Sequence, residues 1–84
     1  MIDREAIYAA INGERARQKL KWGSPHQWGR GDCSSTDVEP IVKSSVLAEE
    51  CGEVARAVLD RDDEALYREL VQVAAVAVAW LESL

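Results

Sequence analysis

Cysteine and histidine are scarce in this sequence, which contains two cysteines and one histidine. Cys33 and Cys51 lack the close spacing of a zinc knuckle, and two cysteines are too few for the disulfide framework of a small secreted domain. His26 is not part of a Glu-x-x-His pair, which excludes the ligand set of a di-iron bundle. The cysteine usage predicts a reducing, cytoplasmic setting.

The sequence also predicts neither an export signal nor a membrane-spanning segment. Residues 1–5 are charged where a signal peptide needs an apolar core. The longest apolar run, residues 71–81, is interrupted only by Gln72 and covers about half of a bilayer core of ~30 Å. Because 10 basic residues face 15 acidic ones, the net charge of −5 argues against binding to a nucleic-acid polymer.

The chain of 84 residues predicts one all-α domain, residues 1–84. Apolar residues at helical spacing predict helices over about residues 2–20, 37–59 and 63–83, joined by a long loop over residues 22–36. A loop of that length in so small a domain is typically functional or disordered.

Local signals place the helix ends. Thr36 and Glu39 have the spacing of a capping box, and Pro40 is acceptable in a first helical turn, so a helix should begin here. The polar residues 60–63 break the pattern for only a few positions. Such a short connection predicts that the second and third helices form an antiparallel hairpin.

The third helix is apolar on every side between residues 71 and 81. A helix of this kind must be buried all round, and two other short helices can hardly enclose it. The sequence therefore predicts a four-helix-bundle core completed by oligomerisation, as a homodimer or a homotetramer. Trp80 is expected in the core or at the subunit interface.

Acidic residues cluster on the second and third helices. At about 100° per residue, Glu49 and Glu50 flank Glu53 within an arc of roughly 100°. If the hairpin folds back near residue 61, Glu53 lies opposite Glu69, and Glu50 lies opposite Gln72. Carboxylates converging between two helices favour a hard divalent cation such as Mg²⁺ or Mn²⁺ that neutralises them. The alternative is an acidic face exposed to solvent.

At these positions the sequence resembles the MazG-like branch of the all-α nucleoside triphosphate pyrophosphatases. That family has E-E-x-x-E on one helix and E-x-x-D on the next. Residues 47–57 are similar to the first motif, and residues 69–82 are similar to the second, with Gln72 in place of the aspartate. Residues 14–18 and 21–23 resemble the opening motif of the small phage-type members.

The resemblance implies Mg²⁺-dependent hydrolysis of a nucleoside triphosphate to the monophosphate and pyrophosphate, a house-cleaning activity. Glu50, Glu53 and Glu69 would hold the metal with Gln72 as a neutral ligand, and Mn²⁺ could replace Mg²⁺. Glu49 would position or deprotonate the attacking water. Because glutamine brings no charge, a non-catalytic helical interaction module derived from this family is the alternative.

Four further residues are candidates for substrate binding. Arg17 and Lys21 are expected to hold the triphosphate, while Arg56 would pair with a phosphate or with a carboxylate; an ordinary surface charge is the alternative for each. Trp22 would stack on the base, as indole rings do in other nucleotide-binding proteins. Its alternative role is to anchor the loop to the core.

Overall fold

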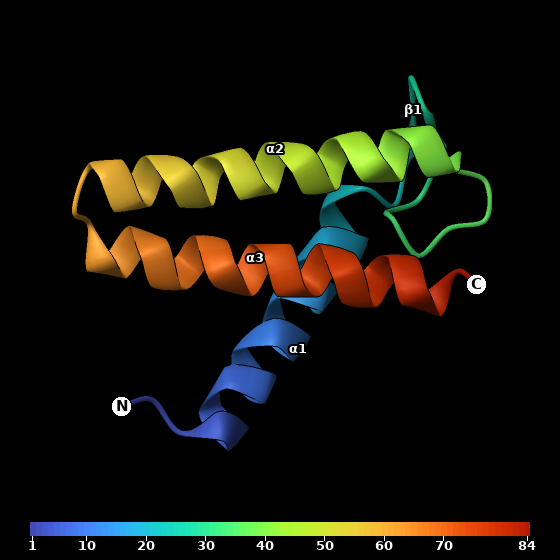
Figure 1. The fold of residues 1–84 in the computed structure, drawn as a ribbon. Helices are drawn as coiled ribbons and strands as arrows, with labels where there is room; N and C mark the ends of the chain where they lie inside the picture. Colours follow the sequence, from blue (N-terminus) through green and yellow to red (C-terminus); the bar gives the residue numbers. More distant parts are fainter.

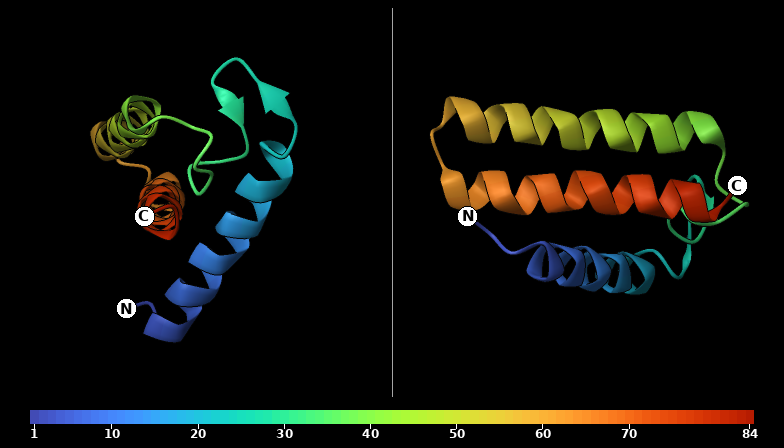
Figure 2. Two further views of the ribbon diagram at one scale, coloured as in Figure 1. Left: turned by 90° about the vertical axis from the view of Figure 1, so that its right-hand side faces the viewer. Right: turned by 60° about the horizontal axis from the view of Figure 1, so that its bottom comes forward.

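The computed structural model describes all residues from Met1 to Leu84. In chain order the elements are α1 (Arg4–Lys21), β1 (Pro25–His26), β2 (Gly29–Arg30), α2 (Pro40–Leu59) and α3 (Asp63–Glu82). α2 and α3 run antiparallel, side by side, and α1 crosses α3 on the side away from α2 (Figures 1 and 2). The mostly helical architecture agrees with the all-α class, and the predicted hairpin is present.

The start of α2 differs from the prediction. The helix begins at Pro40, with Glu39 as its N-cap, and no side chain caps it. The expected bond between Thr36 and Glu39 is absent because the chain makes a turn there, in which the Val38 amide donates to the Ser35 carbonyl. At α3 the polar break supplies the N-cap, since the Asp62 side chain accepts a hydrogen bond from the Ala65 amide at 3.0 Å.

The segment after α1 is not a structureless loop. It contains an antiparallel hairpin, with Pro25 paired to Arg30 and His26 paired to Gly29. Gly29 has a φ of 125°, and a Cβ there would lie 2.6 Å from the Asp37 carbonyl oxygen. Only glycine fits this close approach, which brings the hairpin against the turn leading into α2.

The core of the single chain is small. Its buried apolar residues are Val38, Ala57, Ala75, Val76 and Ala79, and no large side chain is fully buried. Three large apolar residues of α3 remain exposed: Leu70 at 50%, Val78 at 38% and Leu81 at 67%. Within one chain the expected all-round burial of this helix is therefore not reached.

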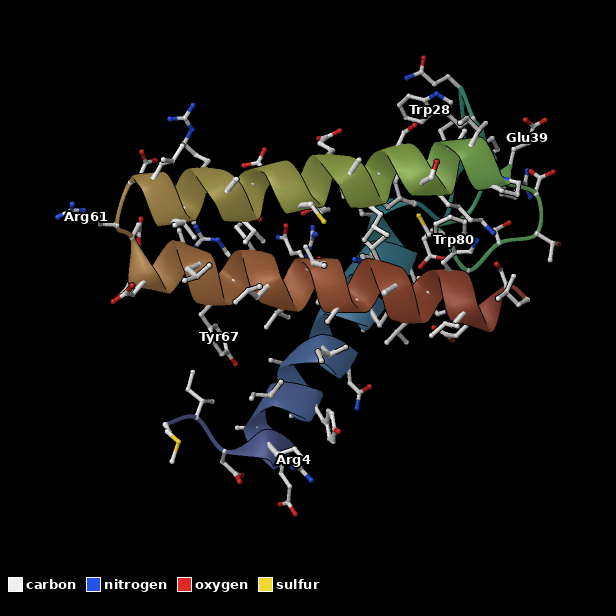
Figure 3. The ribbon with its side chains drawn as sticks, in the orientation of Figure 1. Arg4, Trp28, Glu39, Arg61, Tyr67 and Trp80 are labelled. Atoms are coloured by element: carbon white, nitrogen blue, oxygen red, sulfur yellow. The ribbon has the colours of Figure 1, made fainter.

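Two side chains complete the packing of α3. Trp80 is half-buried and points toward α2 (Figure 3). Lys43 of α2 is buried, and its Nζ donates to Ser83 Oγ at 2.8 Å, which joins the start of α2 to the end of α3.

No helix of the protein is long and apolar enough to cross a membrane.

Candidate nucleotide and metal site

A pocket with a volume of about 380 Å³ lies between the second half of α1, the first half of α2 and the segment of residues 22–38 that contains the β1–β2 hairpin, called the hairpin segment below. Five residues singled out from the sequence line it: Arg17, Lys21, Trp22, Glu49 and Glu50. They come from two segments of the chain, residues 17–22 and residues 49–50, so the fold brings them together. Val38, Val42, Val46 and Val76 supply an apolar wall.

The basic residues lie along α1. Arg17 Nε and Nη2 donate to the two carboxylate oxygens of Glu14 at 2.7 and 2.6 Å. These bonds, above all, hold the pKa of Glu14 below its ordinary value. Nη1 of Arg17 takes no part in this pair, and half of the side chain is exposed, so donors remain for an anion. Lys21 Nζ lies 5.2 Å from the centre of the Trp22 ring.

An aromatic cluster forms another wall of the pocket. The ring centres of Trp22, His26 and Trp28 are 5.4 to 6.5 Å apart. Trp22 thus packs against two residues of the hairpin segment while it also lines the pocket. His26 and Trp28 were not among the predicted site residues. The one feature of the sequence that could have indicated them is that they lie in the same glycine-containing loop as Trp22.

Hydrogen bonds fix the orientation of the histidine ring. The Trp28 amide donates to His26 Nδ1 at 3.2 Å, and Nε2 lies 2.8 Å from the Gly31 carbonyl oxygen. Since Nδ1 accepts, Nε2 carries the hydrogen and donates to Gly31. The neutral ring therefore connects two backbone groups of the hairpin segment, the Trp28 amide and the Gly31 carbonyl.

Glu50 is the most perturbed carboxyl group of the acidic cluster. Burial raises its pKa, and the negative charges of Glu69, Glu49, Glu53 and Glu14 raise it further. An ionised Glu50 is therefore unfavourable in this environment without a nearby positive charge.

Gln72 lies between the two helices beside this group. With its amide NH₂ facing the carboxylates, the Gln72 nitrogen lies 2.7 Å from Glu50 Oε2 and 3.0 Å from Glu69 Oε2. The structure thus places Gln72 against Glu50, as counting residues along the antiparallel helices α2 and α3 predicts. Both carboxylates therefore converge on the Gln72 side chain, and carboxylate oxygens are the hard ligands that suit Mg²⁺.

The remaining acidic candidate is less well placed. Glu53 is exposed on α2 and makes no hydrogen bond or ion pair. Like Glu69 and Gln72, it does not line the pocket. No group of three or more histidine, cysteine, aspartate or glutamate side chains is arranged to hold a metal ion. The convergent carboxylates are thus Glu50 and Glu69, and two carboxylates fit a cation that retains several waters. Gln72 could join them as a neutral ligand only by turning its carbonyl oxygen, in place of its NH₂ group, toward the two carboxylates.

Arg56 lies outside the pocket. Its guanidinium is 69% exposed and faces Asp60 at 3.8 Å, one turn further along α2. The structure therefore does not bring Arg56 together with Arg17 and Lys21, and its surroundings are those of an ordinary surface charge.

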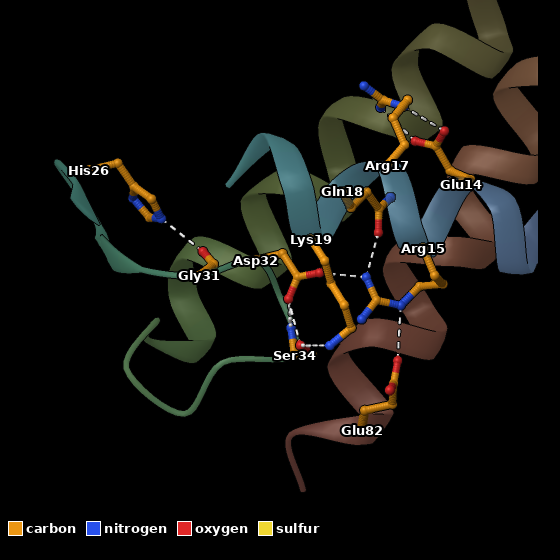
Figure 4. A network of polar contacts seen from close by, with 10 residues as sticks. All are labelled: Glu14, Arg15, Arg17, Gln18, Lys19, His26, Gly31, Asp32, Ser34 and Glu82. Atoms are coloured by element: carbon orange, nitrogen blue, oxygen red, sulfur yellow. Dashed lines mark hydrogen bonds and ion pairs between the residues drawn. The ribbon is translucent and has the colours of Figure 1, made fainter. Parts of the chain in front are cut away.

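A buried polar network holds the hairpin segment in place (Figure 4). Arg15 Nη1 donates to Asp32 Oδ2 at 2.5 Å and to Gln18 Oε1 at 2.9 Å, and Arg15 Nε donates to Glu82 Oε1 at 2.9 Å. Ser34 donates to the other oxygen of Asp32 through both its amide and its hydroxyl. The network links α1, the loop and the end of α3.

The network depends on ionised Asp32. Burial alone would raise the pKa of Asp32, but hydrogen bonds from Arg15 and Ser34, together with the charge of Arg15, bring it below its ordinary value. Sequence reasoning missed this network because Arg15 is separated from Asp32 by 17 positions and from Glu82 by 67.

No protein-family model matches the sequence, and neither a curated protein nor a solved structure matches it. The chemistry of the pocket is therefore the basis for a functional conclusion.

Proposed function

We propose that the protein hydrolyses nucleoside triphosphates to the monophosphate and pyrophosphate with the help of Mg²⁺. The observation that carries this proposal is the pocket itself. In it the basic residues Arg17 and Lys21, the aromatic ring of Trp22 and the acidic residues Glu49 and Glu50 line one space of about 380 Å³. This combination offers contacts to each part of a nucleotide, and the resemblance to MazG-like enzymes points to the same substrate class.

Each residue has a definite task in this reaction. Arg17 and Lys21 attract the triphosphate, and Trp22 presents its ring to the base. Glu50 and Glu69, with Gln72, would hold Mg²⁺, which supplies positive charge to the phosphate oxygens. Glu49 lies in the pocket beside Glu50, where its carboxylate accepts a hydrogen bond from the attacking water. The water oxygen bonds to the α-phosphorus and gives up a proton to Glu49, while the bond from the α-phosphorus to the pyrophosphate leaving group breaks.

The direct test is a pyrophosphate-release assay over a panel of canonical and modified nucleoside triphosphates, with and without Mg²⁺. We expect equimolar nucleoside monophosphate and pyrophosphate, only when Mg²⁺ is present. Release of inorganic phosphate and a nucleoside diphosphate would assign a different bond, and no turnover with any nucleotide would refute the proposal.

One observation favours a non-catalytic helical interaction module as the second candidate. The Gln72 amide reaches both Glu50 and Glu69, so it offers hydrogen-bond donors to these carboxylates without a metal. In such a protein the polar contact would serve only to hold α2 against α3.

Substitutions at Gln72 separate the two candidates. If Gln72 is a neutral metal ligand, Gln72→Asp should tighten Mg²⁺ binding about tenfold because it adds a charged oxygen, and Gln72→Leu should weaken it. Calorimetric titration of Mg²⁺ into the three proteins checks this. Absence of Mg²⁺ binding by the unaltered protein, together with a lower melting temperature for both variants, would favour the interaction module.

We also propose that the protein is a homodimer or homotetramer. The small core and the exposed residues of α3, among them Leu70 and Leu81, support this proposal. The melting temperature should then rise with protein concentration, as mass action requires. A melting temperature that is constant across the micromolar range, with a monomer in light scattering, would contradict it.

A further inference from the structure

Gln18 is a buried polar residue in the wall of the pocket. It is 8% exposed, lies one helical turn after Glu14 and one turn before Trp22, and lines the same space as both. A ligand ring stacked against Trp22 would therefore present its edge to Gln18. The sequence motifs assign no task to this side chain.

The orientation of the Gln18 amide is fixed by Arg15. The Gln18 Oε1 atom accepts a hydrogen bond from Arg15 Nη1 at 2.9 Å. Turning the amide over would place its NH₂ group against the guanidinium, donor against donor. Arg15 itself cannot move aside easily, since it is 6% exposed and is paired with Asp32 and Glu82.

The Gln18 nitrogen can therefore donate a hydrogen bond to a ligand (Figure 4). Its amide nitrogen makes no hydrogen bond within the protein, while its oxygen is taken by Arg15. An amide nitrogen has two hydrogens, so it can donate to a ligand in the pocket. Few other groups in the apolar part of the pocket can donate, because valines line it.

We propose that Gln18 is a specificity-determining residue that donates a hydrogen bond to an acceptor on the nucleobase, a carbonyl oxygen or a ring nitrogen. The inference rests on the proposed function in one respect only, namely that the pocket takes a nucleotide. It does not require that the nucleotide be hydrolysed. A site built around a fixed donor discriminates against a ligand that leaves the donor without a partner.

The test compares two ligands that differ only in the base. Uridine 5′-triphosphate and ribose 5′-triphosphate, which has no base, are titrated calorimetrically without Mg²⁺, so that no turnover occurs. The measured quantity is the ratio of the two affinities. Gln18→Met removes the donor without adding charge, and Gln18→Glu removes it while keeping the oxygen that accepts from Arg15. The matched control is Gln27→Met, which makes the same change at an exposed hairpin position outside the pocket.

We expect the affinity ratio to fall about tenfold in both Gln18 variants, which is the usual effect of one lost hydrogen bond, and to stay unchanged in the control. Gln18→Glu gains an ion pair with Arg15 but places a second negative charge one helical turn from Glu14, so a circular dichroism melt of each variant checks that it is folded. An unchanged ratio in Gln18→Glu would overturn the inference, whether or not Gln18→Met folds. Failure of the unaltered protein to bind uridine triphosphate would overturn it as well.

The outcome is distinguishable from the fate of the proposed reaction. Binding that depends on Gln18 without any release of pyrophosphate would leave the inference standing and refute the hydrolysis. Hydrolysis with an affinity ratio that is independent of Gln18 would do the reverse.

Discussion

Replacing Glu50 or Glu69 with glutamine should lower the rate of pyrophosphate release about 100-fold or more, because a metal ligand supplies several kcal/mol of transition-state stabilisation. The helical fold should remain intact or become more stable. Burial and neighbouring carboxylates raise the pKa of Glu50, so its ionised form disfavours the folded state, and an uncharged side chain relieves that repulsion. Circular dichroism melting and a pyrophosphate assay on the same samples check both parts.

Glu53→Gln serves as the comparison in this experiment. The motif resemblance makes Glu53 a metal ligand and predicts an equal loss. Its exposed position away from Gln72 predicts a smaller loss than either of the other two substitutions. Near-normal turnover in both Glu50→Gln and Glu69→Gln would remove these carboxylates from the mechanism.

Asp32→Asn should lower the free energy of unfolding by about 3 kcal/mol at neutral pH, because it leaves the buried guanidinium of Arg15 without its main partner. That is a large share of the stability of a domain of this size. Urea unfolding of the two proteins measures the difference. Asp37→Asn is the matched control, since Asp37 lies exposed in the same segment and makes no ion pair.

The effect of Asp32→Asn should also depend on pH. The pKa of Asp32 is lowered in the folded protein, so its contribution to stability is fully present above the unfolded value of about 3.9 and is lost as the pH falls through the folded value. The difference between the two proteins should therefore shrink as the pH falls below about 4. A difference that is constant from pH 7 to pH 3 would contradict this role.

Asp32→Asn also tests how the pocket is held together. Asp32 lines the pocket and anchors the hairpin segment that carries His26 and Trp28. A loosened anchor should weaken nucleotide binding even where the helices remain folded, and the fluorescence of the tryptophans in the pocket would report the change.

The sequence by itself determined where the helices lie along the chain and that α2 and α3 pair antiparallel. These are local properties: apolar residues recur at helical spacing, and the polar break at residues 60–63 is too short for any other connection. Once the break is placed, counting residues along two antiparallel helices brings Gln72 to Glu50, and the structure shows that contact. The basic residues of α1 and the acidic residues of α2 were likewise identifiable one segment at a time.

Only the tertiary structure decided how these segments combine. Because α1 crosses α3 and the β1–β2 hairpin folds against the start of α2, Arg17 and Lys21 line the same pocket as Glu49. Arg56 lies outside this pocket. That path is set by contacts between residues far apart in the chain, such as Arg15 with Glu82, and no periodicity or spacing encodes such a pair. The donor orientation of Gln18 is decided in the same way, because it depends on the buried arginine beside it.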